Sequence, residues 1–220
     1  RIAQWLDETG VSAEVLVVDD GSSDGTLALA QSFGERDDRV RGLGYGENRG
    51  KGAAVAFGVA EAKGAEILFS DADLSTPIEE YLQLHEALKE HHVAIGSRAL
   101  PDSQLDKRQP FYREMMGRTF NLLVQALVFP GLQDTQCGFK LFRSEVAKEL
   151  FATRKLDGFA FDVEVLFVAR RRGYTVAELP VVWINDEASR VHPIRDALGM
   201  FRDILKIRRL HRGLGPVDGS

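Results

Sequence analysis

The chain has 220 residues, a net charge of −5, and a composition that is 44% apolar and 28% charged, which is ordinary for a soluble protein with one substantial core. The acidic balance argues against general nucleic-acid binding, and a single cysteine, Cys137, excludes an internal disulfide framework and a cysteine-rich zinc site. No run of about 18 apolar residues occurs, so the sequence contains no candidate for a membrane-spanning helix.

The first half of the chain alternates short apolar runs with helical patterns. Residues 1–10 resemble the end of an amphipathic helix that begins abruptly, so we expect a further element upstream of residue 1. Residues 14–19 form a β-branched run of the kind buried in parallel sheets, and a helical pattern follows up to about residue 33. Residues 39–45 predict a second strand, and the turn ENRGKG leads into a helix of small residues.

Residues 65–77, AEILFSDADLSTP, carry the strongest chemical signal. A buried strand runs into Asp71 and Asp73, and Thr76 and Pro77 are then expected to cap and open a helix over 77–90. In an open α/β sheet, ligands bind at the carboxyl ends of strands, and two neighbouring carboxylates repel each other unless a cation intervenes. Oxygen ligands without histidine or cysteine indicate Mg²⁺ or Mn²⁺ holding a phosphate. The alternative for this stretch alone is a polar loop that caps a helix.

A strand at 92–96 completes a pattern in which strands alternate with helices. This pattern predicts an α/β fold with a mostly parallel sheet that is flanked by helices on both faces. After a polar loop at 99–109, residues 111–129 predict a helix that is apolar on almost every face. Such a helix is either buried in the domain or in contact with lipid.

The second half of the chain is less regular. A polar loop at 133–140 precedes a short helix at 144–151 and an amphipathic helix at 161–172. Residues 175–184 predict a strand, and Pro180 within it indicates an edge strand or a bulge. The last helix, at 193–211, ends in cations, which either complement the helix dipole or form a basic rim that faces a membrane.

Two turns in the first half carry groups suited to a nucleotide. Asp19 and Asp20, at the tip of a strand, can accept hydrogen bonds from a base and from ribose hydroxyls, although an Asx-type turn is the structural alternative. The sequence Asn48-Arg49-Gly50-Lys51-Gly52 places glycines and two cations at a helix start, where a diphosphate can bind. It is not a Walker sequence, and no Gly-x-Gly-x-x-Gly follows the first strand, which argues against dinucleotide binding.

The chain resembles the family 2 glycosyltransferases of the GT-A (Rossmann-like) fold. The resemblance rests on VVDDGSSDGT, NRGKGAA, ILFSDADLSTP, GSR, DTQCGFKLF and FAFDVEVL, in this order and at these spacings. Within the family it is most similar to the dolichyl-phosphate β-glucosyltransferases and next to the mannosyltransferases. It implies one GT-A domain over 1–220, with a nucleotide-sugar-binding half at 1–98, an acceptor half at 99–220 that contains an apolar interfacial helix, and a first strand upstream of residue 1.

The resemblance also implies roles for individual residues. Asp19 and Asp20 would bind the nucleoside with Lys51 nearby, and Asp71 and Asp73 would contact the metal and the diphosphate. The remaining site residues that it implies are Arg98, Arg113 and Arg190, facing phosphates, Ser189 beside Arg190, and Asp134 and Gln136 in an acceptor-side loop close to the sugar. Ser75 stands where mannosyltransferases often carry a glutamine that contacts the metal, which favours the glucosyl branch.

The implied function is inverting transfer of glucose from UDP-glucose to a polyprenyl phosphate of the dolichyl type. We expect the enzyme to act at the cytoplasmic face of a membrane, as a peripheral protein. A lipid phosphate has a second pKa of about 6 and is already largely ionised at neutral pH, so the reaction needs cations that hold two anions together rather than a strong general base. The alternatives are a mannosyltransferase that uses GDP-mannose, an enzyme with a soluble saccharide acceptor, and a non-catalytic module that binds a nucleotide sugar.

Overall fold

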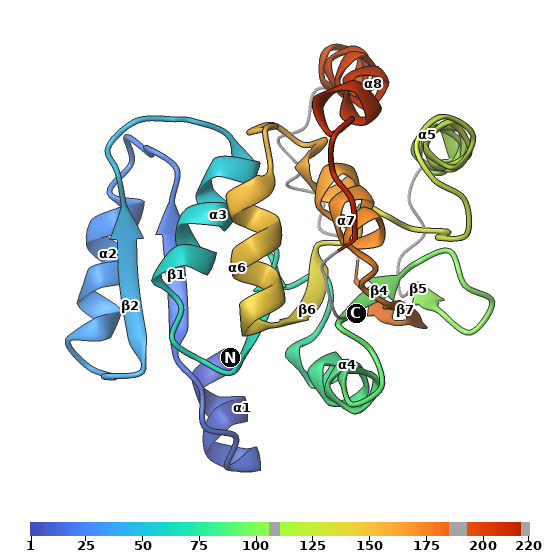
Figure 1. The fold of residues 1–220 in the computed structure, drawn as a ribbon. Coiled ribbons are helices and arrows are strands. Elements are labelled where there is room, and N and C mark those ends of the chain that lie inside the picture. Colours follow the sequence, from blue (N-terminus) through green and yellow to red (C-terminus); the bar gives the residue numbers. More distant parts are fainter. Residues whose placement is uncertain (106–110, 185–192, 217–220) are drawn as a thin grey trace.

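The computed structural model describes residues 1–105, 111–184 and 193–216, in which helices and strands alternate along most of the chain (Figure 1). The helices are α1 (Ile2–Thr9), α2 (Thr26–Gly34), α3 (Lys51–Glu61), the short 3₁₀ helix η1 (Ile78–Glu80), α4 (Tyr81–Leu88), α5 (Phe111–Leu127), α6 (Ser144–Thr153), α7 (Phe161–Arg172) and α8 (Pro193–Leu210). The strands are β1 (Val15–Asp19), β2 (Val40–Gly44), β3 (Glu66–Ser70), β4 (Val93–Ser97), β5 (Gln104–Leu105), β6 (Phe139–Arg143), β7 (Val176–Pro180) and β8 (Val182–Trp183).

The strands form parallel pairs with one antiparallel insertion. Strands β1 and β2 pair in parallel, as do β4 and β7 and the short strands β5 and β8. The largest sheet has the order β3-β6-β4-β7, and β6 runs antiparallel to both of its neighbours. The α/β class with parallel sheet elements is therefore confirmed. Because β6 is antiparallel, its first residues lie at the edge where β3 and β4 end, which brings the loop before β6 to the carboxyl ends of those strands.

Strands β1 and β3 each have an edge without a strand partner in the described part of the chain. Strand β1 is bonded to β2, and β3 is bonded to β6. Helix α3 packs on β1 and α6 packs on β3, and the two helices contact each other. The first strand expected upstream of residue 1 stays a prediction.

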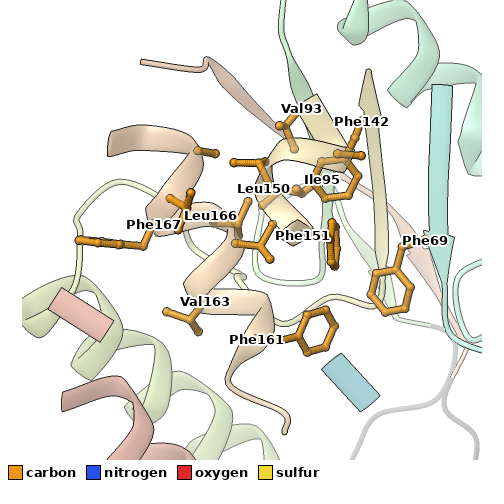
Figure 2. Packing of buried hydrophobic residues seen from close by; sticks show 14 of the residues in the cluster. Phe69, Val93, Ile95, Phe142, Leu150, Phe151, Phe161, Val163, Leu166 and Phe167 are labelled. Carbon is orange, nitrogen blue, oxygen red and sulfur yellow. The ribbon is translucent and has the colours of Figure 1, made fainter. Parts of the chain in front are cut away.

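The main core lies between the central sheet and helices α6 and α7 (Figure 2). Phe69 from β3 packs edge-on against Phe161, and Phe142 from β6 packs edge-on against Phe151 of α6. Helix α7 was expected to be amphipathic, but every residue from 161 to 169 is buried. The expectation was wrong because α6, β7 and α8 all pack against this helix, and its two buried carboxylates have partners far away in the sequence.

The helix expected over 77–90 is shorter and begins differently. Helix η1 precedes α4, and Pro77 rather than Thr76 stands at the start of η1, without a side-chain cap. The Thr76 side chain is buried and its hydroxyl contacts the Cys137 sulfur at 3.9 Å, so the hydroxyl serves a tertiary contact instead of the helix N-terminus.

Helix α5 is not surrounded by protein. Val124 is buried, whereas Leu122 is 66% exposed, so the helix covers the core with one face and leaves apolar side chains on another. Helix α8 packs beside α5 in the same layer (Figure 1). None of the helices in the described ranges has both the length and the hydropathy that crossing a bilayer requires.

Pro180 ends an edge strand, as expected. Strand β7 lies at the edge of the central sheet and stops at Pro180, and the chain then continues as β8, which pairs with β5. The single strand expected over 175–184 is therefore two short strands in different sheets.

Candidate active site

The candidate site lies at the carboxyl ends of β1, β3 and β4, next to the first residues of β6. Asp19 ends β1, Asp71 follows β3, and Arg98 follows β4. The antiparallel course of β6 adds residues 133–138 to the same edge. The topology thus brings together five of the six motifs singled out in the sequence, and FAFDVEVL supports them from α7.

Lys51 and Asp71 form an ion pair at the centre of this edge. The Lys51 Nζ lies 2.7 Å from Asp71 Oδ1 and also sits over the ring of Phe69, 5.3 Å from its centroid. Burial alone would lower the pKa of Lys51, but the carboxylates of Asp162 and Asp71 outweigh it and the pKa is raised. The site therefore presents a charged ammonium group beside Asp71 at neutral pH.

The start of α3 is seated on the loop at 154–158. The Gly52 N–H donates to the Asp157 carbonyl at 2.7 Å. A Cβ on Gly50 would lie 2.6 Å from the same carbonyl oxygen, and Gly50 has a φ of +103°, which favours glycine. The glycines of NRGKG thus allow two loops to approach closely and fix where Lys51 begins its helix.

Asp73 is exposed and has one local contact. Its Oδ1 accepts a hydrogen bond from the Ser75 N–H at 2.9 Å, and Leu74 between them has a left-handed φ of +51°. In the described ranges, no group of three histidine, cysteine, aspartate or glutamate side chains is arranged to hold a metal. Two carboxylates nevertheless fit a magnesium-type ion, since such ions commonly take one or two carboxylates and complete their shell with water and substrate phosphates.

Asp19 and Asp20 differ in whether their carboxylate oxygens already accept hydrogen bonds from the protein. Asp20 accepts hydrogen bonds from the Tyr45 hydroxyl at 2.5 Å and from the N–H groups of Arg49 and Gly50 at 2.8 and 2.9 Å, so it fastens the loop at 45–50. Asp19 is buried, and its Oδ2 accepts from the Ser22 N–H at 3.0 Å. Its Oδ1 is buried and has no partner in the described part of the chain. A buried acceptor without a donor calls for an explanation, and a ligand donor is one.

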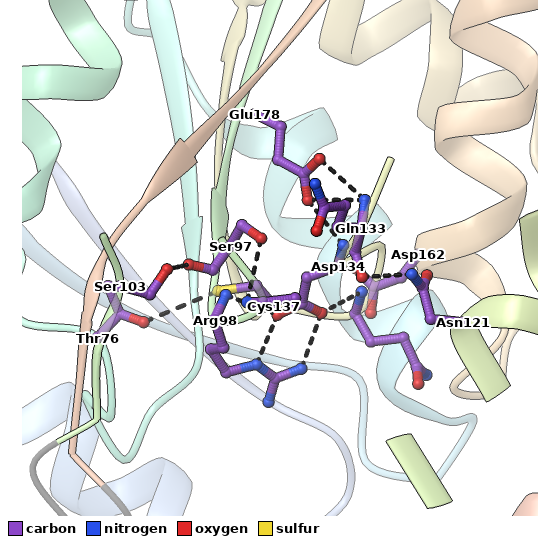
Figure 3. A network of polar contacts seen from close by, with 12 residues as sticks. Thr76, Ser97, Arg98, Ser103, Asn121, Gln133, Asp134, Cys137, Asp162 and Glu178 are labelled. Atoms are coloured by element: carbon purple, nitrogen blue, oxygen red, sulfur yellow. Dashed lines mark hydrogen bonds and ion pairs between the residues drawn. The ribbon is translucent and has the colours of Figure 1, made fainter. Parts of the chain in front are cut away.

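Arg98 and Asp134 form a bidentate pair (Figure 3). Arg98 donates from Nε to Asp134 Oδ2 at 2.7 Å and from Nη2 to Oδ1 at 2.9 Å, and its backbone N–H donates to Oδ2 at 3.0 Å. Burial would raise the pKa of Asp134, but the charge and the hydrogen bonds of Arg98 outweigh it and hold that pKa below its usual value. Asp134 is therefore an ionised carboxylate that orients Arg98.

The loop at 132–138 is fastened from several elements (Figure 3). Glu178 on β7 accepts hydrogen bonds from the backbone N–H groups of Gln133 and Asp134 at 2.9 and 2.7 Å. Asn121 on α5 donates to the carbonyl of Gln133. The predicted residue Gln136 is half-buried, and its side-chain amide donates to the Met200 sulfur on α8 at 3.9 Å.

Lys140 and Asp162 form a buried ion pair to which the sequence analysis assigned no role, and Lys140 Nζ lies 5.8 Å from the centroid of the Phe69 ring. Lys140 Nζ is 2.5 Å from Asp162 Oδ1 and donates to the Cys137 carbonyl at 2.6 Å. Lys140 and Asp162 are nearly inaccessible to solvent. Both residues occur in the motifs DTQCGFKLF and FAFDVEVL, and that occurrence is the only signal that pointed to them. Glu178, Asn121 and Tyr45 had none.

Three predicted site residues cannot be placed with the others. Ser189 and Arg190 lie outside the described residues, and the side chain of Arg113, on α5, does too. The structure brings together Lys51 with Asp71 and Arg98 with Asp134, and it positions Asp19, Asp20, Asp73 and Gln136 around the same strand ends.

The chain matches the model of a known protein family and several curated proteins. Residues 2–151 match the family described as "Glycosyl transferase family 2". The chain is 35% identical over 205 residues to a dolichyl-phosphate β-glucosyltransferase of Dictyostelium discoideum, covering 90% of this chain and 63% of that protein. It is 36% identical over 204 residues to the Homo sapiens protein of the same name, covering 89% and 63%. The chain thus spans less than two thirds of the length of these relatives.

Solved structures with the same fold have lower sequence identity. Mannosyl-3-phosphoglycerate synthase from Rubrobacter xylanophilus superposes with a TM-score of 0.66 at 20% identity, covering 100% of this chain and 70% of that one. A Mycobacterium tuberculosis glucosyl-3-phosphoglycerate synthase, crystallised with Mn²⁺, UDP and phosphoglyceric acid, has a TM-score of 0.67 at 20% identity, covering 98% and 72%. At this identity the likeness establishes the fold, in agreement with the GT-A prediction.

Proposed function

This chain belongs to glycosyl transferase family 2, and from that premise we propose that it transfers glucose from UDP-glucose to a polyprenyl phosphate of the dolichyl type, with inversion at the sugar. The names of the relatives that share about a third of its residues support this substrate pair. The observation that carries the proposal is the Lys51–Asp71 pair at the carboxyl end of β3, because it places a fixed cation and a carboxylate where a diphosphate and its metal would bind.

The donor half comprises residues 1–98. The unpartnered Oδ1 of Asp19 accepts a hydrogen bond from the nucleoside, and Asp20 acts indirectly by fastening the loop that precedes Lys51. Asp71 and Asp73 would hold Mg²⁺ or Mn²⁺, which would supply positive charge for the leaving diphosphate. Lys51, already charged beside Asp71, adds a second cation for the same developing negative charge.

The acceptor half comprises residues 99–220, and Arg98, the last residue of the donor half, pairs with Asp134 of the acceptor half. Asp134 has both carboxylate oxygens occupied by Arg98, and its pKa is lowered, so it serves as an orienting group rather than as a general base. Arg98 uses Nε and Nη2 for this pair and retains further N–H donors for a phosphate. A lipid phosphate, largely ionised above a pKa of about 6, attacks without losing a proton to the protein. Arg113, Ser189 and Arg190 remain candidates for the same phosphate-binding region, and Gln136 is a candidate for the sugar.

The donor and the acceptor are tested in one assay matrix. We expect label from UDP-[¹⁴C]glucose to enter the lipid phase when polyprenyl phosphate and Mn²⁺ are present, and the transfer to stop with a chelator. GDP-[¹⁴C]mannose with the same lipid, and UDP-[¹⁴C]glucose with a soluble saccharide, serve as the competing substrates. Preferential use of either would contradict the proposed substrate pair, and binding of UDP-glucose without any transfer would favour a non-catalytic module.

The acceptor also requires contact with a membrane, and we assign that contact to α5 and α8 at the cytoplasmic face. The two helices pack beside each other and expose Leu122, Phe201 and Leu205. The cations Arg202 and Arg209 of α8 are also exposed. Apolar side chains next to cations on a helix surface are the pattern that binds anionic interfaces peripherally.

Vesicle sedimentation tests this surface. We expect the protein to pellet with vesicles that contain anionic lipid at low salt, and Leu205→Glu to reduce the bound fraction several-fold, since a carboxylate would enter the apolar boundary of an anionic surface. Leu29→Glu is the matched control, because Leu29 is similarly exposed but lies on α2, at the opposite side of the molecule (Figure 1). Equal loss with both substitutions, or no loss with Leu205→Glu, would reject this surface.

A further inference from the structure

Gly138 lies opposite Asp71 where the paired strands β3 and β6 meet the candidate site. The antiparallel register of β3 and β6 pairs Ser70 with Phe139, and the next backbone contact is a hydrogen bond from the Asp71 N–H to the Gly138 carbonyl at 2.9 Å. Residues that oppose each other in an antiparallel pair direct their side chains to the same face. A side chain at 138 would therefore compete with that of Asp71 for the same space.

A side chain at 138 and the Asp71 carboxylate in its present position would occupy the same space. A Cβ on Gly138 would lie 1.9 Å from Asp71 Oδ2, 2.2 Å from its Cγ and 2.6 Å from Oδ1. The φ of Gly138 is not in the left-handed region, unlike that of seven other glycines, so the backbone itself would accept alanine. The glycine is required by the carboxylate across from it and not by its own conformation.

We propose that Gly138 is a positioning residue for the metal site: because it has no side chain, it leaves the space that the Asp71 carboxylate occupies. The inference rests on the proposed function only for what Asp71 then holds. On one side the carboxylate lies against Gly138, and on the other its Oδ1 contacts Lys51 at 2.7 Å. With alanine at 138, either the Asp71 carboxylate must rotate away from Lys51 or the backbone at the start of β6 must shift. The second movement would displace the loop that carries Asp134.

A double-mutant cycle in urea unfolding tests this fit between Gly138 and the Asp71 carboxylate without requiring catalysis. We expect Gly138→Ala to lower the unfolding midpoint in the wild-type background and to have little effect in the Asp71→Ala background, because the obstructing carboxylate is then gone. Non-additivity of this kind is expected for residues in contact or in one network and not for distant, independent positions. If Gly138→Ala alone fails to fold while Gly138→Ala/Asp71→Ala folds, the proposed fit between Gly138 and the Asp71 carboxylate is likewise supported. An equal loss of stability in both backgrounds would overturn the inference.

Titration of UDP in the presence of Mn²⁺ tests the consequence for the site. We expect Gly138→Ala to weaken Mn²⁺-dependent UDP binding by about 10–100-fold, the usual cost of disturbing a group that orients a metal ligand. Gly117→Ala is the matched control, since its Cβ would meet no atom of the described residues within 4 Å, and it should leave the affinity unchanged. A folded Gly138→Ala protein with wild-type affinity would overturn the inference. If the wild-type protein binds no UDP with Mn²⁺, the proposed function fails, and the unfolding cycle still tests whether Gly138 positions the Asp71 carboxylate.

Discussion

Asp71→Asn is expected to lower the rate of glucose transfer by on the order of 10²–10³-fold, the usual cost of removing one group from a charge-stabilising site. Asparagine has nearly the same shape as aspartate, so it fits beside Gly138 and retains one oxygen, but it loses the charge that binds a divalent cation. Lys51 keeps Asp162 nearby as a source of negative charge, so its ammonium group is not left without compensation and the fold should survive.

The turnover number at saturating UDP-glucose, measured over a series of Mn²⁺ concentrations, checks this prediction. Because the variant retains a weaker ligand, a higher Mn²⁺ concentration should restore part of the rate. Asp38→Asn serves as the control, since Asp38 is an exposed aspartate in the turn before β2. An Asp71→Asn protein that works within about threefold of the wild type at low Mn²⁺ would remove Asp71 from the proposed metal site.

Local patterns in the sequence predicted the parts of the site that depend on strand ends. The runs before Asp19 and Asp71 have the composition of buried strands, and parallel strands that end at one edge bring such residues together. The glycine-rich turn before a helix predicted that Lys51 would neighbour a diphosphate, and the family resemblance implied that it lies near Asp19 and Asp20. The strand-end inferences needed only neighbouring residues and the general rule for α/β sheets.

Long-range partners were beyond such reasoning. Asp162 pairs with Lys140 22 positions away, and Glu164 pairs with His211 47 positions away, so the charges on α7 looked like those of a solvated helix face. The contact of Asp20 with the loop at 45–50 was not predicted, because nothing local shows that this loop folds back onto it. Strand β6 was also missed, because residues 133–140 were interpreted as a polar loop and the apolar residues that follow are too few to predict a strand or its direction.

The role of Gly138 is another feature that local sequence patterns could not predict. The glycine belongs to a motif that the sequence analysis singled out, yet a missing side chain has no chemistry to assign. Its meaning depends on the register that places Asp71 opposite, which follows from β6 running antiparallel between β3 and β4. A strand that was not predicted from the sequence therefore determines both the position of the loop before it and the space around Asp71.

Arg98→Leu is expected to destabilise the protein by about 3–5 kcal/mol at pH 7, the usual cost of leaving one partner of a buried pair behind. The Asp134 side chain is 10% exposed whereas that of Arg98 is 31% exposed, so Asp134→Leu should cost less, because the guanidinium left behind can still reach water. The double variant Arg98→Leu/Asp134→Leu should be more stable than Arg98→Leu alone. Urea unfolding of the three variants and the wild type measures the coupling.

The pH dependence of these variants separates charge from packing. In the wild type, Arg98 holds the pKa of Asp134 below the unfolded value of about 3.9, so its contribution to stability is complete above that pH and is lost as the pH falls through the folded pKa. In Arg98→Leu the carboxylate keeps the backbone N–H donor of residue 98 and the charge of Lys140, but burial, the largest single influence on its pKa, then outweighs them and raises that pKa above the unfolded value. Stability therefore falls as the pH rises from about 4 through the raised pKa.

The difference in unfolding free energy between the wild type and Arg98→Leu should therefore grow between about pH 4 and pH 7, because over this range the contribution of Asp134 is constant in the wild type and falls in Arg98→Leu. Replacing Asp134 as well removes the carboxyl that titrates, so the gap between Arg98→Leu and the double variant should close toward pH 4. A gap to the wild type that is constant over this range would mean that Arg98 contributes through packing alone. Asp134 would then have no part in fixing the guanidinium that we assign to the acceptor phosphate.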